Sequence, residues 1–240
     1  MVVRGLAGRN VIVTGGGSGI GAATVARLQE EGAVTIAWDL TAPDAPEGCL
    51  GQVVDVTDTV AIDEALARAR EELGEIHGLV NCAGTLGAAH KLAEQPLEEV
   101  RRTFEINTHG ALQVLQAVLP VMLEQGGGSI VNVASNAALH ARNGLAPYSA
   151  SKAAVLAYTR TAAREYGRRG IRVNAVCPGG TRTPMMGPID EQVAEDLARS
   201  IPLGRFAEPD EIAASIVFLL SDDASYLTGA NLLVDGGALT

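Results

Sequence analysis

Short apolar runs rich in β-branched residues alternate with longer segments of helical periodicity along the whole 240-residue chain. The runs predict strands at Asn10–Thr14, Val34–Leu40, Gln52–Val56, Gly78–Asn81, Ser129–Ser135, Arg172–Cys177 and Asn231–Val234. Between them, apolar residues recur at helical spacing in the segments 20–31, 59–73, 97–124, 147–169 and 208–221. Most predicted strands are apolar throughout, which is typical of strands covered on both faces. The alternation therefore predicts a parallel β-sheet with helices on both sides.

No internal repeat, low-complexity tract or Pro/Gly-rich linker interrupts this order. A composition of 47% hydrophobic and 19% charged residues is typical of a globular protein, and α/β chains of this length often form one domain. We expect a single doubly wound, Rossmann-like α/β domain over residues 1–240. Ligands of such sheets bind beyond the carboxyl ends of the strands, so functional residues are expected just after each strand.

The formal net charge of −10 at pH 7 disfavours negatively charged partners, and no basic cluster offsets it. We therefore expect no nucleic-acid ligand. No apolar run reaches the roughly 18 residues that a membrane span needs. The early apolar stretch Val11–Val13 is also too short for the core of a signal peptide. These features predict a cytoplasmic protein without membrane association.

Cysteine and histidine usage gives no metal or disulfide pattern. The three cysteines, Cys49, Cys82 and Cys177, are widely spaced and form no CxxC pair, which favours small buried side chains in a reducing compartment. The four histidines, His77, His90, His109 and His140, lack the spacing of metal ligands, so we expect no metal site.

A glycine-rich turn, Thr14-Gly-Gly-Gly-Ser-Gly-Ile-Gly21, separates the first predicted strand from a helical stretch. Glycines allow a tight turn and a close approach of the backbone to a pyrophosphate, whose charge a helix N-terminus favours. A flexible loop would also use glycine, but this placement favours phosphate binding. The residues concerned are Gly15, Ser18, Gly19, Ile20 and Gly21. Their spacing, Gly-x3-Gly-x-Gly, is a variant of the commoner Gly-x-Gly-x2-Gly.

Asp39 lies at the end of the apolar run of the second predicted strand, about 20 residues after these glycines, and Leu40 follows it. A carboxylate at this place can accept hydrogen bonds from the ribose hydroxyls of NAD, whereas it would repel the 2′-phosphate of NADP. No basic residue stands in the glycine turn to bind that phosphate. The alternative is that Asp39 only caps a turn. We interpret the cofactor as NAD.

Tyr148 and Lys152 stand four residues apart on a predicted helix and therefore on the same face. A free phenol, with a pKa of about 10, is a poor base near neutrality. A cation about 4 Å away would favour the phenolate by roughly 4 kcal/mol at an effective dielectric near 20. We expect Lys152 to lower the pKa of Tyr148 in this way, and Ser135, at the end of the fifth strand, to hydrogen-bond the substrate oxygen. The three residues predict proton transfer to or from an alcohol or carbonyl.

Taken together, these motifs resemble those of the compact branch of the short-chain dehydrogenase/reductase family, over essentially the whole chain. Further matches are Asp55, Asn81-Cys82-Ala83-Gly84, Asn107, and Pro178-Gly179 with Thr183. The one departure is Cys82, where many relatives carry a second asparagine; the backbone role of that position should survive the change.

The resemblance implies a role for each matching residue. Asp55 would bind the adenine amino group beside the Val56 backbone, and Asn81, Ala83 and Gly84 would line the cofactor channel. Asn107 would hold a water that relays protons to Lys152, which would also bind the nicotinamide ribose. The nicotinamide end would be held by Pro178, Gly179, Thr181 and Thr183. Asn107, Ser135, Tyr148 and Lys152 are thus the expected catalytic set, and relatives of this architecture form homotetramers.

The resemblance leaves the substrate open. A short segment near 185–208 would cover a small molecule, lined by Asn136, His140, Arg142, Leu145, Met185 and Met186, although His140 and Arg142 would also suit a surface loop. A small secondary or cyclic alcohol is preferred to a 3-oxoacyl thioester on an acidic carrier protein, because the chain itself is acidic. A non-catalytic NAD-binding scaffold would lack one of the four catalytic residues. An epimerase of the extended branch would have a longer C-terminal region.

Overall fold

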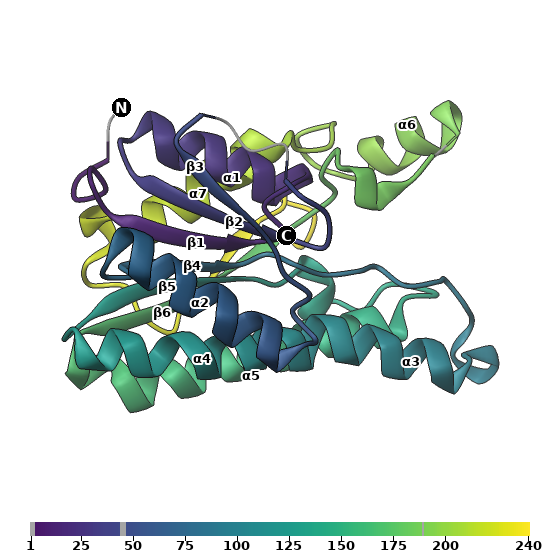
Figure 1. Cartoon of the computed structure of the whole chain (residues 1–240). Coiled ribbons are helices and arrows are strands. Elements are labelled where there is room, and N and C mark those ends of the chain that lie inside the picture. The colour runs from purple at the N-terminus through teal and green to yellow at the C-terminus, as the bar shows by residue number, and fades with distance from the viewer. Residues whose placement is uncertain (1–2, 44–46, 189) are drawn as a thin grey trace.

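The computed structural model describes residues 3–43, 47–188 and 190–240. Within these residues, seven strands form one parallel sheet in the order β3-β2-β1-β4-β5-β6-β7 (Figure 1). The strands are β1 (Asn10–Thr14), β2 (Val34–Asp39), β3 (Cys49–Val53), β4 (Gly78–Asn81), β5 (Gly128–Val133), β6 (Ile171–Pro178) and β7 (Asn231–Val234). The predicted doubly wound, single-domain α/β fold is confirmed.

The order of the strands creates a crevice beside β1. The chain runs outward from β1 to β2 and β3, and then returns to the other side of β1 to begin β4. Val11 accordingly pairs with Thr35 of β2 on one side and with Gly78 of β4 on the other. Ligands of open parallel sheets bind at such a reversal, beyond the carboxyl ends of the strands.

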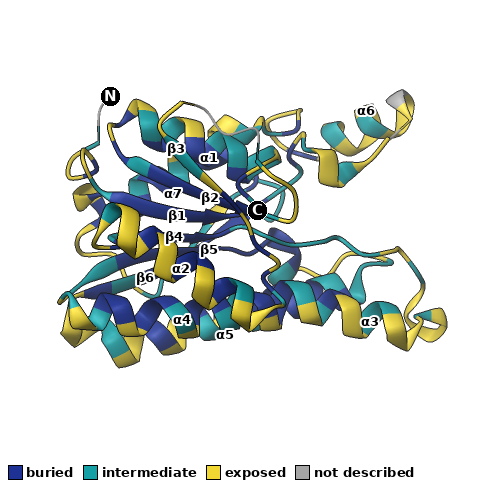
Figure 2. Cartoon of the chain, in the orientation of Figure 1, coloured by how far each residue is buried: buried dark blue, intermediate teal, exposed yellow. Residues whose placement is uncertain are grey.

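Alternate side chains of each strand enter different cores, which explains why the strands are apolar throughout. Val11 and Val13 pack with α1 (Gly19–Glu30) and α7 (Pro209–Leu220), while Ile12 between them packs on the opposite face. That face is covered by α2 (Thr59–Leu73), α4 (Ala111–Glu124) and α5 (Ala146–Tyr166). Figure 2 shows the strands buried between the two helical layers.

Two further helices, α3 (Leu97–Phe104) and α6 (Glu191–Arg199), extend beyond the carboxyl ends of the strands, at the right of Figure 1. The expected helix over 97–124 is divided: a π-helical turn, Glu105–Gly110, joins α3 to α4. The segment near 185–208 contains α6, which was not predicted. Asp190 caps this helix by accepting hydrogen bonds from the N–H groups of Gln192 and Val193.

The expected bounds of four strands were wrong: β5 spans Gly128–Val133 rather than 129–135 and β6 spans Ile171–Pro178 rather than 172–177, and β2 and β3 differ as well. β2 ends at Asp39, and Leu40 is exposed. β3 spans Cys49–Val53 rather than 52–56, because β3 lies at the sheet edge and its pairing ends where Asp39 of β2 meets Val53. Val54 and Val56, which extended the apolar pattern, are buried beyond the strand instead.

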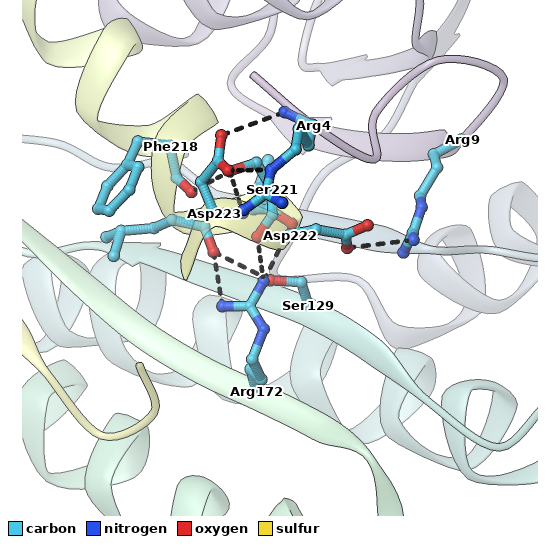
Figure 3. A network of polar contacts seen from close by, with 10 residues as sticks. Arg4, Arg9, Ser129, Arg172, Phe218, Ser221, Asp222 and Asp223 are labelled. Atoms are coloured by element: carbon cyan, nitrogen blue, oxygen red, sulfur yellow. Dashed lines mark hydrogen bonds and ion pairs between the residues drawn. The ribbon is translucent and has the colours of Figure 1, made fainter. Parts of the chain in front are cut away.

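At the amino ends of the strands, a polar network holds α7 to the sheet (Figure 3). The guanidinium of Arg172 in β6 donates hydrogen bonds to the carbonyls of Leu219, Leu220 and Ser221, at distances of 2.8 to 3.0 Å. These carbonyls belong to the last turn of the helix and the residue after it, where the helix has no further N–H groups to offer. No helix among the described residues is long and apolar enough to cross a membrane.

Candidate active site

A cleft of about 990 Å³ opens at the carboxyl ends of the strands, at the reversal beside β1. Most of its lining comes from the loops after β1 to β6 and from the start of α5, and the rest from α3, the π-helical turn, α6 and the segment after it. A cleft of this size accommodates a dinucleotide-sized ligand together with a small molecule.

Backbone geometry at one end of the cleft requires glycine. Gly15 and Gly19 have φ angles of +66° and +52°, in the left-handed region that other residues avoid. A Cβ on Gly21 would overlap the Gly15 carbonyl oxygen, so α1 can approach the turn closely only with glycine there. The first turn of α1 leaves N–H groups without intrahelical partners at the cleft, where they suit a phosphate.

Asp39 lies beside this turn, at the end of β2. Its Oδ2 accepts a hydrogen bond of 2.9 Å from the Gly17 N–H, and its Oδ1 one of 2.8 Å from the Leu40 N–H. A Cβ on Gly17 would lie 2.9 Å from Oδ2, so glycine permits the contact. Each carboxylate oxygen keeps a second lone pair. The turn therefore fixes the carboxylate and leaves it able to accept further hydrogen bonds.

A second set of hydrogen bonds joins the loop after β1 to the loop after β4, across the crevice. Thr14 Oγ1 at the end of β1 accepts hydrogen bonds from the N–H groups of Cys82 and Ala83 after β4, at 3.0 and 3.1 Å. Gly15 is also tightly packed here, since a Cβ would lie 3.0 Å from Ala83 Cα. Together these contacts fix the distance between the two loops at the base of the cleft.

Ser135, Tyr148 and Lys152 line the same cleft from neighbouring elements. Ser135 follows β5, and its Oγ accepts a hydrogen bond of 3.1 Å from the Ala137 N–H. Tyr148 and Lys152 lie one turn apart on α5. Lys152 is 4% exposed, and its Nζ donates a hydrogen bond of 2.8 Å to the Val133 carbonyl.

The ionisation of these groups is set mainly by burial. Burial raises the pKa of Tyr148; the neighbouring Ser135 hydroxyl and the Arg142 charge act in the opposite direction, while Cys82 adds to the rise. Burial also lowers the pKa of Lys152 to about 8, although Cys82 and Cys177 oppose this shift. The expectation that the pKa of Tyr148 is lowered, by Lys152, was therefore wrong: desolvation of the phenol outweighs the Ser135 hydrogen bond and the charge of Arg142, and Lys152 contributes no lowering.

Burial raises the pKa of the Cys82 and Cys177 thiols to about 11 each. Both thiols are therefore protonated at neutral pH and offer no nucleophile. All three cysteines are free. Among the residues that the structure describes, no group of three or more His, Cys, Asp or Glu side chains could hold a metal ion.

Asn107 lies behind the cleft, in the π-helical turn. Its Nδ2 donates hydrogen bonds to the Thr85 carbonyl and Ser151 Oγ, at 2.8 and 3.0 Å, and its Oδ1 accepts one of 2.7 Å from the Thr85 N–H. A Cβ on Gly84 would lie 3.0 Å from Oδ1 and 3.3 Å from Lys152 Nζ. Glycine at position 84 thus lets Asn107 and Lys152 approach each other.

The structure brings most of the sequence-predicted residues into the cleft lining. The expected cofactor residues there are Gly15, Ser18, Gly19, Ile20, Gly21, Asp39, Leu40, Asp55, Val56, Ala83, Gly84, Tyr148, Lys152, Pro178, Gly179, Thr181 and Thr183. The expected substrate residues there are Asn136, Arg142, Leu145, Met185 and Met186.

Three predicted residues lie outside this lining. Asn107 is one layer behind it. The Asn81 Nδ2 is turned inward, toward the Ala111 carbonyl and Asn132 Oδ1 at 3.2 and 3.1 Å. His140 is exposed on the loop before α5, because its backbone turns outward after the short helical turn Asn136–Ala138.

Sequence reasoning missed cleft residues that follow no strand. Arg101, Arg102 and Ile106 enter from α3 and the π-helical turn, and Leu197 enters from α6. Phe206 also lines the cleft, and the Arg182 guanidinium lies 5.7 Å from the centre of its ring. The amphipathic spacing of Val193 and Leu197 after the cap at Asp190 was the available sign of α6.

Comparison with known proteins identifies the family. Residues 15–239 match a family model described as enoyl-(acyl carrier protein) reductase. The chain is 40% identical to a 3-oxoacyl-[acyl-carrier-protein] reductase of Thermotoga maritima, over 97% of this chain and 98% of that protein. It is 35% identical to a 2,5-dichloro-2,5-cyclohexadiene-1,4-diol dehydrogenase of Sphingobium indicum, over 97% and 96%. The crystal structure of a levodione reductase superposes with a TM-score of 0.91 at 37% identity, covering 96% of this chain and 97% of that chain. The chain belongs to the short-chain dehydrogenase/reductase family and is an oxidoreductase of alcohols and ketones.

Proposed function

We propose that the protein interconverts a small secondary or cyclic alcohol and its ketone with NAD(H), using Tyr148 as the general acid–base. The observation that carries this proposal is the convergence of Ser135, Tyr148 and Lys152 on a cleft whose other end combines a glycine turn with Asp39. The relative from Sphingobium indicum, named for a cyclohexadiene diol, supports a cyclic substrate.

The residues present fit a dinucleotide. The cradle around Gly15 and Gly21 would have no room with side chains, and the carboxylate of Asp39 suits ribose hydroxyls. The remaining cofactor residues named from the sequence would line its path. NAD, when bound, supplies the hydride acceptor for alcohol oxidation.

Each catalytic side chain then has one role. Ser135 Oγ hydrogen-bonds the substrate oxygen and stabilises the charge that develops there. Tyr148 takes the hydroxyl proton in oxidation and returns it in reduction. Lys152 binds the nicotinamide ribose. The Asn107 side chain is committed to Thr85 and Ser151, so it positions the π-helical turn behind Lys152, where a proton-relaying water would be held.

The test is a screen of secondary and cyclic alcohols with NAD and with NADP, followed by absorbance of the reduced nicotinamide. We expect turnover of a cyclic alcohol and a higher kcat/KM with NAD. Replacing Asp39 by Ala together with Leu40→Arg should shift the preference toward NADP, because the repulsion is removed and a cation is added. A wild-type preference for NADP would contradict the cofactor assignment.

A second candidate is a 3-oxoacyl-thioester reductase, which the Thermotoga maritima relative favours. The net charge of −10 disfavours an acidic carrier protein. Acetoacetyl-coenzyme A belongs in the same screen: if it is reduced with a much higher kcat/KM than every free ketone, this second candidate replaces the first.

A further inference from the structure

Arg142 lies on the loop before α5, and two backbone hydrogen bonds hold this loop in place. The Arg142 carbonyl accepts a hydrogen bond of 3.2 Å from the Leu145 N–H, which forms a turn just before α5. Two residues further on, the Gly144 carbonyl accepts a bond of 3.1 Å from the His90 N–H, which lies on the segment after β4. The loop is thus attached to a second wall, and Arg142 lines the cleft together with Ser135 and Tyr148.

The guanidinium of Arg142 is available for a ligand. Within the ranges 3–43, 47–188 and 190–240, its side chain makes no ion pair and no hydrogen bond, in a chain with 28 acidic against 18 basic residues. By contrast, Arg101 in the same cleft lies 3.7 Å from Glu98. The positive charge of Arg142 also lowers the pKa of the Tyr148 phenol, against the rise due to burial. Arg142 and Tyr148 line the same cleft, so a single ligand there can meet both side chains.

The apolar side chains of Leu145 and Met185 line the same cleft as Arg142. A ligand there meets a hydrophobic surface for its carbon skeleton and one cation for a charged substituent. A guanidinium can bind a carboxylate through two parallel hydrogen bonds, which gives orientation as well as affinity.

We propose that Arg142 binds a carboxylate carried by the substrate, so that the enzyme acts on a hydroxy- or oxo-carboxylate whose reacting oxygen faces Tyr148. This inference rests on the proposed function and narrows its substrate class. It assigns Arg142 as the residue that selects charged over neutral substrates and sets the position of the carbon skeleton relative to Ser135.

The test compares two ketones that differ only in charge, 3-oxocyclohexanecarboxylate and 3-oxocyclohexanecarboxamide. The wild-type protein with NADH should show a kcat/KM for the carboxylate about 10- to 100-fold above that for the amide, the range of a charged hydrogen-bonded pair. Arg142→Gln should reduce this ratio to about one. Arg142→Lys should keep an intermediate ratio, because an ammonium retains the charge but not the paired geometry.

Arg102→Gln is the matched control, since Arg102 lines the cleft but does not act on Tyr148. It should leave the ratio unchanged. An equal ratio in the wild type, an unchanged ratio in Arg142→Gln, or an equal loss in Arg102→Gln would each overturn the proposal.

Calorimetry separates this inference from the proposed function. Cyclohexanecarboxylate and cyclohexanecarboxamide are titrated into the wild type and Arg142→Gln, each in the presence of NADH. If no ketone or alcohol is turned over, the proposed function fails. The inference still stands if the wild type alone binds the carboxylate more tightly than the amide, and fails if it does not.

Discussion

Tyr148 occupies a position where burial opposes the reaction proposed for it. Its pKa is raised by desolvation, and Ser135 and Arg142 only partly offset that rise. Meanwhile Lys152 donates to the Val133 carbonyl at 2.8 Å. Deprotonation of Tyr148 near neutral pH therefore requires a further positive charge in the assembled complex, which the oxidised nicotinamide would carry. We expect alcohol oxidation to increase with pH, through an apparent ionisation that belongs to the coupled site.

Removal of the phenol oxygen tests its role directly. Tyr148→Phe should fold normally and bind NADH, because it loses a single hydroxyl at an open cleft. Its kcat should fall about 10²- to 10⁴-fold, the usual contribution of general acid–base catalysis. Steady-state kinetics and a thermal unfolding curve measure the two properties. Near-normal turnover would show that another group transfers the proton.

Lys152 should titrate within the working pH range of the enzyme. With a pKa lowered by burial to about 8, it is an ammonium below that pH and an amine above it. Because this value lies below the ordinary 10.5, the group makes the free energy of unfolding increase as pH rises from about 8 toward 10.5. The chain has only two lysines, so ¹³Cε-lysine labelling gives two NMR signals, and Lys91→Arg assigns them. A Lys152 signal that titrates above pH 10 would contradict the lowered pKa of this residue.

At the level of single elements, the Arg172 network in Figure 3 joins the start of β6 to the end of α7. Arg172→Met keeps the aliphatic stem and removes the donors. The buried Leu220 carbonyl then has no partner, and the carbonyls of Leu219 and Ser221 keep only the 3.3 Å bonds from Ser129 Oγ and the Ala224 N–H. We expect a loss of about 2–4 kcal/mol in the free energy of unfolding.

The same substitution should leave kcat unchanged, because the network lies at the amino ends of the strands and the cleft at the carboxyl ends. Urea unfolding measures the free energy of unfolding, and steady-state kinetics measures kcat. Arg4→Ala, which removes the exposed pair with Asp223, is the control and should hardly change the midpoint. A large drop in kcat for Arg172→Met would contradict the separation of the two ends.

Local sequence pattern determined the bounds of several elements. β1, β4, β7 and α2 have the predicted bounds, because their apolar runs end where glycine, polar residues or a capping Asp58 begin. β3 was misplaced, since an edge strand ends where its one partner ends. The π-helical turn was not predicted, because its cause is tertiary: Asn107 bonds to Thr85 and Ser151, both distant in sequence.

Cleft residues that directly follow a strand could be predicted, because ligands of parallel sheets bind beyond the carboxyl ends of the strands. Arg101, Leu197 and Phe206 could not be predicted, since α3 and α6 reach the cleft only through their packing. The sequence also could not give the pKa values, because desolvation depends on how deeply α5 places Tyr148 and Lys152.

For the whole molecule, the outer surface of α5 bears on assembly. Ala153 and Ala154 are half-buried and Ala157 is exposed, so small residues on α5 are left for a second copy to cover. We predict a homotetramer built through α4 and α5. Light scattering should give four times the mass of one chain, and Ala157→Glu should dissociate it without unfolding the subunit. A stable wild-type monomer at micromolar concentration would contradict the prediction.

Trp38 is the one tryptophan of the chain, it is 1% exposed, and it lines the cleft one residue before Asp39. Its Nε1 donates a hydrogen bond of 2.6 Å to Gln52 Oε1, so the ring is fixed. The protein thus contains its own fluorophore at the end of the cleft proposed to bind the dinucleotide. Indole emission overlaps the absorption band of reduced nicotinamide, so NADH should quench Trp38 by resonance energy transfer, saturably and without any label. Binding detected by calorimetry with no change in emission would place the dinucleotide elsewhere.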